Sequence, residues 1–204
     1  MNPFKTVCLA TLSALFLVVP LTTGTASGTE LYSGVTTLKS GTILGLSFSG
    51  GFRIVSTGGS VIATCTGGSV SGKTTNTGGA GVNVTASFEK SGFTYTGCTK
   101  TTDSIEGGTM EFAYTSGLNA NVSGKGFKVT VETIAELGGT CAFTWGTGGT
   151  NLGTLVGSTT GNAVLTINTV LNGASGNAFL CPTSVKWEAN LTWTSPKPAH
   201  ATNS

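Results

Sequence analysis

Four cysteines are the residues whose number and spacing most clearly indicate chemistry. They are Cys65, Cys98, Cys141 and Cys181, with Cys8 standing apart near the start of the chain. An even number of cysteines in an exported protein predicts disulfides, and four cysteines allow three connectivities. We expect pairing in chain order, Cys65 with Cys98 and Cys141 with Cys181, each bridge contributing roughly 3–4 kcal/mol by loop closure. A zinc site made of the same four thiolates is disfavoured, because such sites use closely spaced cysteine pairs.

Acid–base chemistry has few candidates in this chain. Histidine occurs once, at His200, and aspartate once, at Asp103. A Ser-His-Asp triad needs a histidine held by a rigid scaffold, and His200 lies in a segment expected to be loose. Asp103, Glu106 and Glu111 are close enough in sequence to suggest the paired carboxylates of a glycosidase or a calcium site. We expect them instead to be solvated polar residues, so the chain is predicted to have no catalytic site, cofactor or metal.

One stretch matches the pattern of a phosphate-binding loop. Gly67, Gly72, Lys73 and Thr74 fit G-x4-G-K-[ST]. That motif works only where a helix follows the loop and directs its N-terminal N–H groups at phosphate. The residues that follow, Thr-Asn-Thr-Gly-Gly, do not start a helix, so we expect no nucleotide. The formal net charge of +2 likewise gives no reason to expect a nucleic-acid partner.

The first 26 residues have the three parts of a secretory signal peptide. Lys5 supplies the positive charge, an apolar run extends over 7–20, and small residues follow at Gly24-Thr25-Ala26. Cleavage is expected after Ala26, with Gly28 as the alternative. The apolar run is shorter than the ~20 residues of a transmembrane helix, so removal is favoured over anchoring.

The rest of the composition indicates a folded β protein with few charges. Threonine is the most frequent residue, glycine follows with 32 copies, and only 9% of residues are charged. Threonine is β-branched and favours strands, while glycine supplies turns and bulges. A hydrophobic fraction of 38% is ample for a core. The polar surface must therefore consist largely of hydroxyl groups.

Apolar residues alternate with polar ones along most of the chain. The clearest case is 185–194, where Trp187 and Trp193 share the predicted inner face. Cys65 and Cys141 fall on the apolar phase of their strands, and Trp145 is assigned to the core in preference to a sugar-stacking surface. Gly-Gly pairs, many about ten residues apart, read as turns. We predict one all-β domain at 27–194, an antiparallel β-sandwich or closed antiparallel barrel of about ten short strands, with a flexible tail at 195–204.

Several segments carry a resemblance to a known group of proteins. They are 61–66, 72–74, 78–81, 93–98, 151–155 and 179–187, the last reading Phe-Leu-Cys-Pro-Thr-Ser-Val-Lys-Trp. Together they resemble a bacterial family of small secreted Gly/Thr-rich proteins, similar to those labelled protein activator of alkane oxidation. The resemblance implies secretion, and the family offers no catalytic residues to transfer.

The sequence thus predicts a secreted or cell-surface protein with a structural or interaction role. Its expected partners are cell-surface or matrix components, not nucleic acids or nucleotides. The alternative is a membrane-associated or pore-type β-barrel, with which alternating strands and low charge also agree. A hydrolase acting through carboxylates alone is the third and weakest reading.

Overall fold

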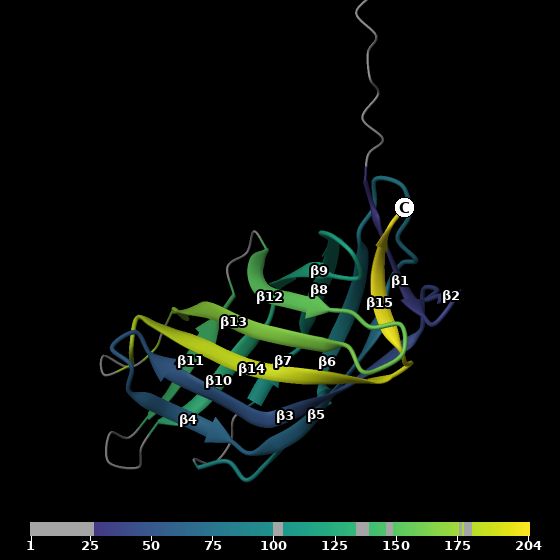
Figure 1. The fold of residues 1–204 in the computed structure, drawn as a ribbon. Helices are drawn as coiled ribbons and strands as arrows, with labels where there is room; N and C mark the ends of the chain where they lie inside the picture. The colour runs from purple at the N-terminus through teal and green to yellow at the C-terminus, as the bar shows by residue number, and fades with distance from the viewer. Residues whose placement is uncertain (1–26, 100–103, 134–138, 146–148, 176, 178–180) are drawn as a thin grey trace, which may run out of the picture.

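The computed structural model describes residues 27–204 except 100–103, 134–138, 146–148, 176 and 178–180. The expected signal peptide at 1–26 lies outside these residues. No helix in the described part is long and apolar enough to cross a membrane. The strands, shown in Figure 1, are β1 (Thr29–Ser33), β2 (Thr36–Thr37), β3 (Ile43–Ser56), β4 (Val61–Cys65), β5 (Gly67–Thr74), β6 (Val84–Thr96), β7 (Ser104–Glu106), β8 (Gly108–Tyr114), β9 (Ala120–Lys125), β10 (Lys128–Thr133), β11 (Gly139–Thr144), β12 (Thr150–Val156), β13 (Val164–Gly173), β14 (Ser184–Ser195) and β15 (Ala199–Asn203).

Eight of these strands form a closed antiparallel barrel. Their order is β12-β9-β8-β6-β5-β3-β14-β13, and β13 pairs back onto β12 to close the ring. The all-β prediction is confirmed, and of the two predicted architectures the barrel is the one observed. Closure pairs both edges of each of these strands, which removes the free edges that an open sheet would present.

The barrel strands are longer than predicted. β3 has 14 residues, β6 has 13 and β14 has 12. The Gly50-Gly51 pair, predicted to be a turn, lies inside β3, where the register with β14 shifts between Ala189 and Leu191. Both glycines have positive φ, and a Cβ on Gly51 would lie 1.8 Å from the carbonyl oxygen of Cys65. The pair is therefore a bulge that bends one continuous strand.

The long strands continue past the barrel and carry further pairing partners. β4 pairs with the second half of β3, and β11, β10 and β7 follow in order from the end of β13. In Figure 1, β4, β10 and β11 lie at the end of the molecule opposite β1, β2 and β15. The outer faces of β13, β14, β3 and β4 form one continuous four-stranded surface at this end.

Aromatic side chains fill much of the interior. Trp187 and Trp193 are 2% and 0% exposed, as their alternation predicts, and Trp145 is 3% exposed. The ring centroids of Trp145 and Trp187 lie 5.1 Å apart in an edge-to-face arrangement, while Trp193 packs edge-on against Phe112. All three tryptophans therefore belong to the core, and the core assignment of Trp145 is confirmed.

Both predicted disulfides are present. Cys65 bonds Cys98 and Cys141 bonds Cys181, with sequence separations of 33 and 40 residues. Cys65 and Cys141 are 2% and 1% exposed, as their place on the apolar phase predicts. One bridge links the last residue of β4 to the segment that follows β6, and the other links the middle of β11 to the segment that precedes β14.

The C-terminal segment is ordered, so the prediction of a flexible tail at 195–204 is wrong. Residues 199–203 form β15, which pairs with β1 from Ser33 opposite Ala199 to Thr29 opposite Asn203. With β2 these strands make a separate three-stranded sheet at one end of the molecule (Figure 1). His200 is only 6% exposed and stacks on Tyr32, with ring centroids 5.5 Å apart. Backbone pairing with β1 supplies the order that the sequence pattern does not indicate.

Candidate functional site

A groove crosses the outer face of β13, β14, β3 and β4. It has a volume of about 500 Å³, which is within the range of about 300–1,000 Å³ that is usual for small-molecule sites. Side chains on the outward phase of the four strands line it with hydroxyl, amide and charged groups: Ser49, Arg53, Thr64, Thr66, Thr166, Asn168, Glu188 and Asn190.

Strand register aligns these polar side chains into a row. Each member of the row is the direct cross-strand partner of the next, running Asn168–Glu188–Arg53–Thr64 from β13 to β4. Facing side chains on neighbouring strands approach to about 4.5–5.5 Å between Cβ atoms, which is close enough to interact. Pairing alone thus brings together residues from four separate parts of the chain.

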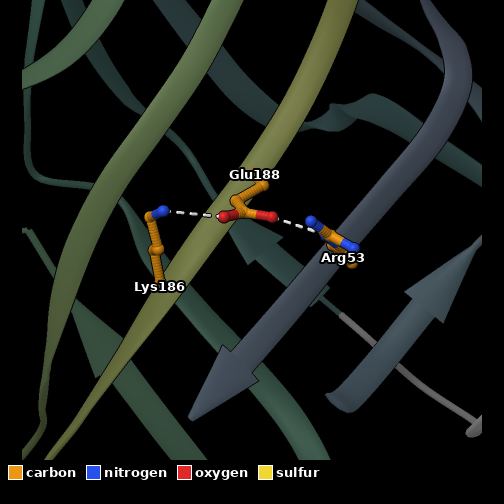
Figure 2. A network of polar contacts seen from close by, with 3 residues as sticks. All are labelled: Arg53, Lys186 and Glu188. Atoms are coloured by element: carbon orange, nitrogen blue, oxygen red, sulfur yellow. Dashed lines mark hydrogen bonds and ion pairs between the residues drawn. The ribbon is translucent and has the colours of Figure 1, made fainter. Parts of the chain in front are cut away.

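Glu188 is the centre of a three-residue charge network in this row. Its Oε2 accepts a hydrogen bond from Arg53 Nε at 2.5 Å, and its Oε1 lies 2.8 Å from Lys186 Nζ. Figure 2 shows the two cations on opposite sides of the carboxylate. The hydrogen bond from Lys186 and then that from Arg53 lower the pKa of Glu188. Glu188 is therefore an anion whose two oxygens are both engaged.

The glycine bulge in β3 forms part of the groove wall. Gly50 and Gly51 line it together with Ser49, and Gly51 is two residues before Arg53. A Cβ on Gly50 would contact no other group within 4 Å, so this position faces open space. The glycine bulge that bends β3 therefore also leaves space beside the charge network.

A second hollow of about 390 Å³ adjoins the first and shares Arg53 and Glu188 with it. Register produces a parallel row here as well, running Val170–Lys186–Val55–Val61. Val61 and Val170 are 56% and 50% exposed, which is high for valine in a folded protein. One side of the charge network is thus apolar and the other is hydroxyl- and amide-lined.

The two hollows are lined by hydroxyl, amide and charged groups that can form hydrogen bonds and by exposed valines. They contain one carboxylate, Glu188, so they lack the second carboxylate that glycoside hydrolysis uses. Their hydroxyl groups have no histidine or free carboxylate beside them to act as a base. Across the described residues, no three His, Cys, Asp or Glu side chains lie together in a way that could hold a metal ion.

The residues singled out from the sequence lie elsewhere. Glu106 of β7 pairs with Lys128 at 3.5 Å, and Glu111 of β8 accepts a hydrogen bond from Asn83. Asp103 lies outside the described residues. The phosphate-loop match at 67–74 is the strand β5, which leaves no loop to surround a phosphate. Cys65 is the one predicted residue that lines the groove.

The sequence does contain a signal for the groove, although a weak one. Lys186 and Glu188 occupy the polar phase of the predicted strand 185–194, which is expected to face solvent. Arg53 lies 135 residues away from Glu188. Charges are rare in this chain, so three of them close together are informative, but only strand register shows that they meet.

No family model, no curated protein and no solved structure matches the chain.

Proposed function

We propose that this protein acts outside the cytoplasm, secreted or at the cell surface, as a structural or interaction protein without catalytic activity. The observation that carries the proposal is the pair of intramolecular disulfides, Cys65–Cys98 and Cys141–Cys181. Stable disulfides form in oxidising compartments and are rare in the reducing cytosol. The signal-peptide pattern at 1–26 and the resemblance to secreted Gly/Thr-rich proteins support the same proposal.

The surface supports an interaction role. The outward phases of the barrel strands carry mainly hydroxyl and amide groups, and only 9% of the chain is charged. Such a surface changes little with ionic strength, because screening by salt acts on charges. The closed barrel offers a rigid support for the groove on its outer face.

The membrane-spanning alternative is less well supported. A transmembrane barrel turns apolar side chains outward to lipid and polar ones inward. Here β14 has the opposite pattern, with Trp187, Leu191 and Trp193 buried inside and Lys186 and Glu188 outside. We therefore retain the structural or interaction role.

Fractionation of the native host tests this proposal directly. The mature protein should be recovered from the medium or the cell surface, with a mass about four units higher after reduction, two for each bridge. Recovery from the cytoplasm with four free thiols would overturn the proposal.

A further inference from the structure

We propose that the groove and the adjoining second hollow, which share Arg53 and Glu188, together bind an acidic saccharide. Arg53 and Lys186 hold its carboxylate, and the hydroxyl and amide groups of the groove form hydrogen bonds with its hydroxyls. This assignment rests on the proposed function, since it names the partner class of an extracellular interaction protein.

The charge of the network is the first step. Arg53 and Lys186 share one carboxylate, so the network has a surplus of one positive charge. Both oxygens of Glu188 are already bound to the two cations, so Glu188 is poorly placed to accept hydrogen bonds from a ligand. Its role is to position the cations, and the group that the network can receive is an anion.

The two cations keep donors for such a ligand. A guanidinium has five N–H groups, and Arg53 gives Glu188 the one at Nε. The Arg53 side chain is 59% exposed and that of Lys186 is 41% exposed. A guanidinium held at Nε presents its remaining N–H groups in one plane, which suits a carboxylate.

The uncharged residues of the groove indicate the chemistry of the rest of the ligand. Thr64, Thr166, Asn168 and Asn190 offer hydroxyl and amide groups that both donate and accept hydrogen bonds. Sugar hydroxyls also do both, so they match this lining. The exposed side chains of Val61 and Val170 lie on the other side of the charge network, where they can contact the C–H face of a sugar ring.

Other anions fit the same lining less well. A nucleic acid is held through many phosphates by many cations, whereas this network has a surplus of one. An acidic peptide would supply carboxylates but not a dense set of hydroxyl groups. The combination of one surplus charge with a hydroxyl- and amide-rich lining favours a glycan that contains uronic acid.

The test uses the purified, oxidised protein and a galacturonic acid tetramer, with the methyl-esterified tetramer as the uncharged counterpart. Binding is measured by calorimetry, and chemical-shift changes locate the site. We expect the acid to bind, the ester to bind at least about tenfold more weakly, and shifts at Thr64, Asn168 and Asn190. Salt should weaken binding of the acid.

Substitutions assign the binding to the groove. Arg53→Ala should weaken binding of the acid at least about tenfold, because it removes charge-assisted hydrogen bonds from an exposed side chain. Lys128→Ala is the matched control. It removes one exposed cation that also pairs with a glutamate, Glu106, but it lies outside the groove. Binding of the acid to this control should equal that of the unaltered protein.

Four results would overturn the assignment. They are no binding of the acid, equal binding of acid and ester, an equal effect of the two substitutions, and equal binding of a polyglutamate peptide, which would reassign the groove to acidic peptides. None of these results concerns where the protein resides, so an extracellular protein that fails this test would still satisfy the proposed function.

Discussion

Two adjacent glycines in the β3 bulge allow backbone conformation and steric space to be separated by experiment. Gly50 and Gly51 have φ of 78° and 79°. A Cβ on Gly50 would contact nothing within 4 Å, whereas one on Gly51 would lie 1.8 Å from the carbonyl oxygen of Cys65. Alanine at either position bears the same left-handed backbone cost, and only at Gly51 does it also collide with β4.

The expected magnitudes follow from these contacts. Gly50→Ala should lower the free energy of unfolding by about 1–2 kcal/mol, the cost of an L residue in this region. Gly51→Ala adds separation of β3 from β4 at the pair Phe52–Cys65, where lost backbone hydrogen bonds cost about 1 kcal/mol each. The total for Gly51→Ala should be about 3–4 kcal/mol, and its Tm should fall by roughly 10 °C.

Urea unfolding followed by tryptophan fluorescence measures both variants under oxidising conditions. The difference between them, about 2 kcal/mol, is the steric contribution alone. Equal losses for the two variants would refute the close approach of Gly51 to the Cys65 carbonyl, and with it the description of this pair as a bulge packed on β4.

The remaining predictions concern the second disulfide and the buried histidine. Replacing Cys141 and Cys181 together by alanine should lower the free energy of unfolding by about 4 kcal/mol, because the bridge closes a 40-residue span. A urea titration under oxidising conditions measures this loss, and an unchanged midpoint in the double variant would contradict the prediction. Burial lowers the pKa of His200 below its ordinary value, and its Nδ1 has no hydrogen-bond partner. The unfolded chain therefore takes up the proton first, so stability should be full above about pH 6.5 and fall as the pH drops toward the folded-state pKa. Urea midpoints from pH 5 to 8 should show this slope, and His200→Gln should flatten it; an equal slope in both proteins would argue against His200 as its source. Glu188 does not obscure this window, because the hydrogen bonds from Lys186 and Arg53 lower its pKa from an already acidic value.

The features that can be predicted well from the sequence are those that depend only on the local alternation of apolar and polar residues. Trp187 and Trp193 alternate with polar residues, and a period of two places them on one face whatever the strand pairs with. Cys65 and Cys141 follow the same rule. Their bonding to Cys98 and Cys181 then requires only that neighbouring parts of the chain stay close.

The features that the sequence misses depend on distant partners. Gly50-Gly51 has the same local pattern as a turn, and only the approach of Cys65 identifies it as a bulge. The segment 199–203 lacks an apolar pattern, and its order comes from β1 at the other end of the described chain. Arg53 and Glu188 meet through strand register, which no local pattern encodes.

The pairing of β1 with β15 also bears on the order of folding. Thr29 must find Asn203, so nearly the whole described chain forms the loop that this contact closes. Long-range strand pairing is slow because its loop-closure entropy is lost before the contact is gained. Closing the barrel also needs a long-range pairing, that of β3 with β14, but its partners are nearer in sequence, with Arg53 and Glu188 135 residues apart. The three-stranded sheet should therefore be the last part of the molecule to form. A folding intermediate should consist of a closed barrel in which β1 and β15 are not yet paired.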